Sequence, residues 1–277
     1  MSLTVFEIVL VAAVLHASWN AIVKAGKNTV LTMVLVTASA ALWAIVLLPV
    51  LPSPSPESWP YIALSAALQI VYFALVARIY RIADMSQTYP IMRGAAPLIV
   101  ALAGTLFLEE TLSSPAWLGV CIICSGILIM LWSGGQKSQE GLILALLNAL
   151  VISGYTLVDG VGVRLSAAPA SYTLWIFLIT GASIVCWATL TQWSQTRDYL
   201  RLNWHLGAIG GLGTLVSYGL ALYAMTQAPV AVVAALRETS ILFSAVISWL
   251  ILKEHITVVR CVSVCVIAIG AITLRLA

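Results

Sequence analysis

Long apolar segments separated by short polar connectors make up almost the entire chain. Most connectors are brief, as in "LPSPSPESW" at 51–59 and "GGQKSQ" at 134–139. An apolar segment of about 20 residues can cross a hydrocarbon core as a helix, whereas the strands of a membrane barrel alternate over about ten residues. The pattern therefore predicts transmembrane helices without a soluble domain between them. Ten such spans are predicted, at 3–24, 30–51, 59–80, 86–108, 115–133, 140–160, 171–191, 206–226, 229–252 and 257–275.

The composition agrees with a membrane protein and narrows the function. Hydrophobic residues make up 62% of the 277 residues and charged residues 8%, with a mean hydropathy of +1.06, so the charged side chains are too few to cover a soluble domain. The sequence holds no nucleotide-binding glycine-rich loop, metal motif or nucleophile elbow. We expect no enzyme, no cofactor, no metal and no nucleic-acid partner. The five cysteines all fall inside predicted spans, where we expect them to pack.

The two halves of the chain repeat one pattern. A shift of 144 residues places Arg93 on Arg237 and Glu110 on Glu254. Because an odd number of spans per repeat inserts the second half upside down, five spans per half predict inverted repeats, an arrangement in which many secondary transporters bind substrate between the halves. The fold class predicted is an all-α membrane protein with ten transmembrane helices in two inverted five-helix repeats around a central cavity. The predicted units are a first repeat, a linker and a second repeat, at 1–133, 134–139 and 140–277.

Similar sequences end the fourth and ninth spans, "LFLEE" at 106–110 and "LILKE" at 250–254. Together with ten spans in two repeats, they make the chain resemble the EamA-type transporters of the drug/metabolite transporter superfamily, over essentially its whole length. Where that family commonly has a glycine before the glutamate, this sequence has Glu109 and Lys253. The resemblance implies a central cavity lined mainly by the first, third, fourth, sixth, eighth and ninth spans.

Polar side chains follow one face of several of these spans. In the first span His16, Asn20 and Lys24 are four residues apart, which keeps them on one side of a helix. The sixth, third and eighth spans carry polar residues at similar helical spacing: Asn148, Tyr155 and Asp159, then Gln69 and Tyr72, then Thr214 and Tyr218. From these faces we expect the following residues to contact the substrate: His16, Trp19, Asn20, Gln69, Tyr72, Tyr155 and Tyr218.

The same polar residues are also compatible with purely structural roles. His16 and Asn20 could cross-link helices through hydrogen bonds. Lys24 and Asp159 lie near span ends, where long or charged side chains reach the membrane surface. The tyrosines could belong to an aromatic belt at the interface.

Two arginines lie deep inside apolar spans, Arg93 and Arg237. A charge in the middle of the bilayer costs a few kcal/mol, so such groups face the protein interior or water and mark a pathway. A guanidinium group suits carboxylate or phosphate oxygens, which predicts a substrate with an anionic group. The alternative is a structural ion pair, in which Glu238 beside Arg237, or Asp159, neutralises an arginine.

The glutamates that follow the fourth and ninth spans have a simpler explanation. Glu110 and Glu254 stand just before the next predicted helix, and Ser113 or Ser114 ahead of Pro115 makes a conventional helix start. We expect these glutamates to cap the next helix.

The function predicted is a secondary transporter that moves a small anionic or zwitterionic metabolite, such as an amino acid or organic acid, across the plasma membrane by alternating access. Without a nucleotide-binding loop the energy must come from a gradient, and protons are the candidate coupling ion. Proton carriers are expected among Glu238, Asp159 and His16. The alternatives are an exporter of hydrophobic or cationic drugs, and a membrane enzyme or scaffold. We expect a multi-pass protein of the bacterial inner membrane, with the substrate and the lipid bilayer as partners and a monomer as its plausible state.

The orientation is left with two opposed predictions. Nine Lys and Arg residues fall on one side of the predicted spans and two on the other. The positive-inside rule then places both termini outside the cytoplasm, whereas the family resemblance implies that both termini lie inside.

Overall fold

All regular structure in the described part of the chain is helical. The computed structural model describes residues 1–26, 28–83, 85–133, 138–250, 253 and 257–277, and no strand occurs among them. The all-α prediction is confirmed. Eight helical stretches of the described residues are long and apolar enough to cross a membrane, one of them the interrupted stretch Val230–Leu250, and α5 is a shorter apolar helix. The elements are α1 Leu3–Ala25, α2 Thr29–Leu47, η1 Leu48–Val50, η2 Pro56–Ser58, α3 Trp59–Ile82, α4 Met85–Phe107, α5 Ser114–Ile129, η3 Met130–Ser133, α6 Gln139–Ser166, α7 Pro169–Met225, α8 Val230–Arg237, α9 Ser240–Leu250 and α10 Val258–Leu276.

Short polar side chains fix where several helices begin. The hydroxyl of Ser2 accepts a hydrogen bond from the amide of Val5, and that of Ser113 accepts one from Ala116, each at 3.3 Å. Such caps satisfy amide donors that the first helical turn leaves unpaired. The capping residues all lie at or beside predicted connectors: Ser2, Asn28, Ser113, Ser138 and Thr257.

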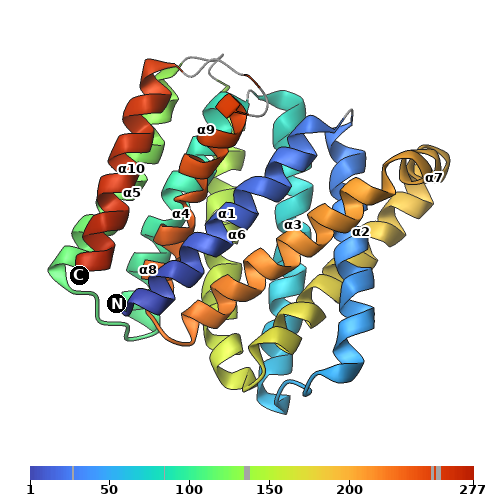
Figure 1. Ribbon diagram of the computed structural model, residues 1–277, viewed down its shortest axis with the longest axis horizontal. Coiled ribbons are helices and arrows are strands. Elements are labelled where there is room, and N and C mark those ends of the chain that lie inside the picture. The colour runs from blue at the N-terminus through green and yellow to red at the C-terminus, as the bar shows by residue number, and fades with distance from the viewer. Residues whose placement is uncertain (27, 84, 134–137, 251–252, 254–256) are drawn as a thin grey trace.

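The connector predicted at 192–205 is wrong. The seventh and eighth predicted spans form one 57-residue element, α7, which is interrupted only at Gln192, where φ is −152° and ψ is 41°. The segment from Trp193 to His205 contains no glycine or proline, so its polar residues continue the helix instead of ending it. At roughly 85 Å of helix, α7 is much longer than one crossing requires. Figure 1 shows its two arms diverging from a bend on the right, beside α2.

The ninth predicted span is broken in the middle. α8 ends at Arg237 and α9 begins at Ser240, with Glu238 and Thr239 between them. The amide of Glu238 donates to Ala235 at 3.1 Å and that of Thr239 to Leu236 at 3.0 Å, so the last turn of α8 tightens into three-residue spacing. A helix break in mid-span exposes backbone groups and is tolerated only inside the protein or beside a cavity.

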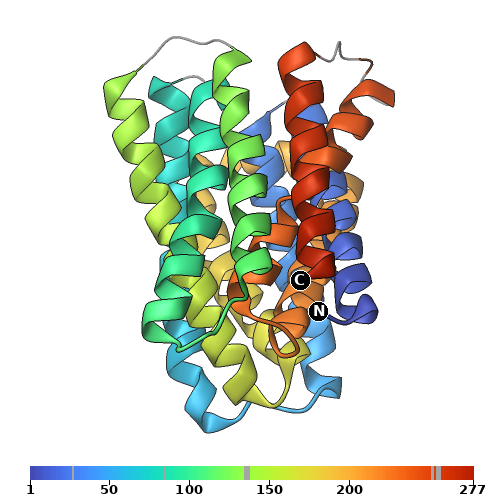
Figure 2. The same cartoon turned by 90° about the vertical axis from the view of Figure 1, so that its left-hand side faces the viewer.

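The fifth predicted span is shorter as an α-helix than expected, because α5 ends at Ile129 and continues as the 3₁₀ element η3. It packs closely against α10. The two helices stand side by side at the left-hand edge in Figure 1 and face the viewer in Figure 2. Glycines make this approach possible. A Cβ atom on Gly119 would lie 2.6 Å from Leu274, and one on Gly270 would lie 2.9 Å from the backbone nitrogen of Ile123.

The helices that carry the predicted polar faces contact one another and their neighbours α4 and α9. α6 packs against α3 and α4, while α1 packs against α7 and α9. Both termini lie at the same end of the molecule (Figure 1), where Arg275 donates to the carbonyl oxygen of Met1 at 3.1 Å. This arrangement brings α4, α6 and the α8–α9 break together around one interior region.

Candidate functional site

A buried ion pair joins the two halves of the chain. Nε of Arg93, in α4, donates to Oε2 of Glu238, at the α8–α9 break, over 2.8 Å. Only 13% of the arginine side chain and 7% of the glutamate side chain are exposed. The alternative of a structural ion pair through Glu238 is therefore present, and the arginine that Glu238 neutralises is Arg93 of α4, not the adjacent Arg237. The two residues are on different spans, and sequence spacing alone does not reveal that these spans bring them into contact.

The second arginine has a different environment. The guanidinium carbon of Arg237 lies 5.0 Å from the centroid of the Tyr218 ring, a cation–π contact. Among the described residues no carboxylate lies within ion-pair distance of Arg237. The repeat explains the difference, because the 144-residue shift that places Arg93 on Arg237 places Gly94 on Glu238. Duplication carried two arginines into the centre, but only one carboxylate of this kind.

Asp159 is fully buried in α6 and does not reach the membrane surface as its position near a span end suggested. Tyr172 donates to its Oδ1 over 3.0 Å, and Tyr218 donates to its Oδ2. Both tyrosines belong to α7, one on each arm. Tyr218 therefore contacts Asp159 through its hydroxyl group and Arg237 through its ring. By contrast Lys24, the other residue near a span end, is exposed.

Tyr72 of α3 and Tyr155 of α6 lie against each other. Their ring centroids are 6.1 Å apart in an edge-to-face arrangement. Tyr155 is close enough to interact electrostatically with Arg93, Arg237 and Asp159. Both tyrosines keep part of their surface accessible. Part of their aromatic surface is therefore not covered by neighbouring side chains.

The polar residues of α1 reach the same region. The rings of His16 and Trp19 meet edge to face at 5.2 Å, and His16 is within electrostatic range of Arg93 and Arg237. The indole N–H of Trp19 is buried and has no partner among the described residues, so it is a donor available to a ligand. Asn20 is less available, because its amide donates to the carbonyl oxygen of His16 at 2.7 Å.

Two amide side chains of the predicted polar faces also differ in whether their polar groups already have hydrogen-bond partners. The amide group of Gln69 donates to the hydroxyl of Ser65 at 3.2 Å. That of Asn148 donates to the sulfur of Met92 at 3.0 Å, while its carbonyl oxygen is buried without a partner in the described part of the chain. Among the residues described, no three His, Cys, Asp or Glu side chains are grouped so as to hold a metal ion.

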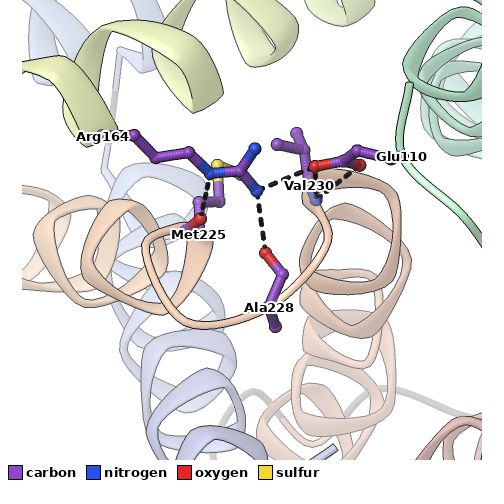
Figure 3. A network of polar contacts seen from close by, with 5 residues as sticks. All are labelled: Glu110, Arg164, Met225, Ala228 and Val230. Atoms are coloured by element: carbon purple, nitrogen blue, oxygen red, sulfur yellow. Dashed lines mark hydrogen bonds and ion pairs between the residues drawn. The ribbon is translucent and has the colours of Figure 1, made fainter. Parts of the chain in front are cut away.

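A second polar network ties four segments together at the end of α6 (Figure 3). Nη2 of Arg164 donates to Oε1 of Glu110 over 2.8 Å and to the carbonyl oxygen of Ala228 over 3.1 Å, and Nε donates to that of Met225 over 2.8 Å. Both carboxylate oxygens of Glu110 accept from the amide of Val230, at 3.1 and 3.0 Å. We call these five residues the Glu110 network.

The prediction that Glu110 caps the next helix is wrong. It caps α8, the helix that starts at Val230 in the other half of the chain, where a carboxylate favours the positive end of the helix dipole. Ser113 caps α5 instead. Glu254, the equivalent residue of the second half, lies outside the described residues.

Three residues of these networks were absent from the predicted site: Ser65, Arg164 and Tyr172. Arg164 and Tyr172 lie near the ends of predicted spans, a position typical of residues at a membrane interface. Their roles depend on contacts with other elements, Arg164 with the turn after α7 and Tyr172 with Asp159 of α6. The one sequence signal for Tyr172 was that Asp159, on the polar face of α6, needs a hydrogen-bond donor from a neighbouring helix.

Comparisons with known proteins agree with this architecture. The model of the EamA-like transporter family matches the chain twice, over residues 6–132 and 139–276, which shows a two-repeat organisation. The fold is similar to a crystal structure of another protein, with a TM-score of 0.74 and 16% sequence identity over 100% of this chain and 98% of that one. The comparison with curated proteins gave no match.

Proposed function

Because the chain belongs to the EamA-like transporter family of the drug/metabolite transporter superfamily, we propose that it carries a small organic anion or zwitterion, of the amino-acid or organic-acid class, across the plasma membrane. The observation that carries this proposal is the environment of Arg237. Its guanidinium group lies in the interior against the face of Tyr218, without a carboxylate at ion-pair distance among the described residues.

The charges around Arg237 favour an anionic ligand. Arg93 is already neutralised by Glu238, so its donors are partly engaged and it supports the site chiefly by holding α4 to the α8–α9 break. Arg237 retains donors for a ligand carboxylate or phosphate, and its planar group can bind two oxygens at once. The cation–π contact with the aromatic ring offsets only part of the free-energy cost of burying the arginine. A bound ligand anion would offset the rest of that cost.

Further groups in the region suit the rest of a small metabolite. The indole N–H of Trp19 and the carbonyl oxygen of Asn148, both without a partner among the described residues, offer one donor and one acceptor. The accessible surfaces of Tyr72 and Tyr155 offer aromatic walls. A few polar groups among apolar and aromatic side chains are typical of small-molecule sites.

Alternating access around this site is supported by the Glu110 network. It links the end of α4, the end of α6 and the turn between α7 and α8, so it closes one end of the bundle (Figure 3). In this mechanism the two ends open in turn, and a gradient drives net movement.

The cellular placement is also part of the proposal. An integral multi-pass protein of this family fits the bacterial inner membrane. The side of the protein richer in basic residues then faces the cytoplasm, with Lys24, Arg78, Arg201 and Lys253 among others. The protein acts as a monomer, with protons as the coupling ion.

The proposal is tested by ligand-induced thermal stabilisation of the purified protein, followed by uptake into proteoliposomes. The panel contains amino acids, organic acids, phosphonates and lipophilic cationic dyes. We expect stabilisation and saturable uptake for at least one compound with a carboxylate or phosphonate group, and none for the dyes. Stabilisation by the dyes alone would replace the anion carrier with an exporter of cationic drugs.

A further inference from the structure

Three side chains near the centre could bind a proton, and the structure separates them. The carboxylate of Glu238 is held by Arg93 in a buried ion pair. His16 lies within electrostatic range of two arginines, so protonating it would add a third positive charge to the same region. Asp159 is the candidate whose charge is not already matched by an ion pair within the described part of the chain.

The surroundings of Asp159 can satisfy both its charged and its neutral form. Tyr172 donates to one carboxylate oxygen and Tyr218 to the other. A phenol hydroxyl also accepts hydrogen bonds, so a protonated Asp159 can donate to one tyrosine oxygen while its carbonyl oxygen still accepts from the other tyrosine. A proton carrier needs this property, because it must hold and release its proton inside the protein.

The groups that face Asp159 come from four helices. They are Ser65 of α3, Tyr155 of α6 itself, Tyr172 and Tyr218 of α7, and Arg237 of α8. Of these five residues only Arg237 carries a charge. The charge balance of the anion site is therefore set by Asp159 and Arg237, which Tyr218 connects through its hydroxyl group and its ring.

We propose that Asp159 is the proton-binding site of the carrier and that Tyr218 couples it to anion binding at Arg237. This inference rests on the proposed function. When Asp159 is ionised, the four charges of the centre, Arg93, Arg237, Glu238 and Asp159, cancel. When a proton from water bonds to a carboxylate oxygen of Asp159, the centre gains one net positive charge, and an anion is then bound more tightly. Substrate and proton cross together and are released together, and no covalent bond of the substrate changes.

The inference predicts how affinity depends on pH. For the unchanged protein, substrate affinity should rise as pH falls, by at most about tenfold per pH unit for one coupled proton. Asp159→Asn resembles the protonated acid in charge and shape. Its affinity should no longer depend on pH, and a pH gradient should no longer drive accumulation in proteoliposomes. Asp198→Asn, which alters an exposed aspartate paired with Arg197, is the matched control and should keep both properties.

The two tyrosines separate coupling from simple support of Asp159. Tyr218→Phe keeps the ring beside Arg237 and removes only the hydroxyl, and it should lower the number of protons taken up per substrate. Tyr172→Phe removes the other phenol from Asp159 without touching Arg237, and it should keep that ratio. An equal loss in both variants would overturn the coupling role of Tyr218.

A measurement without substrate keeps this inference separate from the proposed function. Acidification of the purified protein should produce an infrared C=O band of a protonated carboxyl group that is absent in Asp159→Asn. If no anion of the panel binds, the proposed function fails. The presence of this band in the unchanged protein and its absence in Asp159→Asn would still show that Asp159 binds the proton. If anions bind but Asp159→Asn retains gradient-driven accumulation, or the band persists in it, the carrier stands and the proton site is refuted.

Discussion

At the scale of single residues, three residues other than glycine adopt a backbone conformation that normally favours glycine. The φ angles of Glu109, Ala167 and Lys253 are 53°, 53° and 56°. Glu109 and Lys253 occupy equivalent positions of the two repeats, where the family resemblance implied glycine. A left-handed conformation costs a residue with a Cβ atom about 1 kcal/mol or more. The structure therefore explains why glycine suits these turns, and it shows that this chain tolerates the strain twice.

Replacing Glu109 with glycine should stabilise the protein, because it removes the Cβ clash at a turn whose conformation is already fixed. The gain should be about 0.5–1 kcal/mol, since glycine also gains freedom in the unfolded chain. Thermal unfolding in detergent measures it. Glu109→Ala removes the carboxylate but keeps the Cβ atom, so an equal gain in that variant would show that charge and not backbone strain is responsible.

At the scale of helices, the Glu110 network holds together elements that must separate if this end opens. Glu110 has only 8% of its side chain exposed and serves both Arg164 and the first amide of α8. A neutral amide at this position can still accept one hydrogen bond, but it cannot neutralise the arginine. The network is therefore stronger than the exposed pair of Arg78 and Glu140 at the other end of α6.

Glu110→Gln should make the interior at this end more accessible. A probe cysteine at Ala231, which is 1% exposed in the first turn of α8, should react faster with a maleimide in this variant, in a background without the native cysteines. Glu140→Gln breaks the exposed pair and should leave the rate unchanged. Equal rates in the two variants would refute a closing role for the Glu110 network.

The contact between α5 and α10 gives a prediction about stability. Gly270→Ala should lower the unfolding temperature, because the new methyl group would meet the backbone of Ile123 and Gly119. Gly219→Ala is the control, since its Cβ atom would lie 3.7 Å from the nearest atom, an ordinary contact. Similar unfolding temperatures for the two variants would mean that α5 and α10 do not pack as closely as described.

Local features of the fold could be predicted from the sequence, and long-range pairing could not. The apolar segments and the polar caps at Ser2 and Asn28 depend on residues that are close together in the sequence. The helical course of 193–205 was missed because its polar residues suggest a loop, although nothing in that segment stops a helix. The inward position of the arginines followed from the cost of a buried charge, but the choice of Glu238 as partner for Arg93 depends on how two distant spans meet.

At the scale of the whole molecule, the distribution of basic residues predicts one orientation in the membrane. Nine Lys and Arg residues fall on one side of the predicted spans and two on the other. The positive-inside rule places the richer side in the cytoplasm, and both termini outside it.

Labelling of single cysteines in intact cells should report this orientation. Asn28→Cys and Ser53→Cys are exposed positions in connectors on opposite sides. We expect an impermeant maleimide to label Ser53→Cys in intact cells, and Asn28→Cys only after permeabilisation. The reverse pattern would support the family orientation and show that the charge count is misleading here.

The central claim is that Arg237, which has no ion pair among the described residues, binds the substrate anion, while the paired Arg93 supports the structure. Substrate dissociation constants of Arg237→Lys and Arg93→Lys, measured by calorimetry on protein shown to be folded, test it most directly. A lysine at 93 can still neutralise Glu238, whereas a lysine at 237 loses the planar, two-oxygen contact. We predict a Kd at least about tenfold higher for Arg237→Lys, or about 1.4 kcal/mol, and a smaller change for Arg93→Lys. An unchanged Kd in Arg237→Lys would contradict this claim.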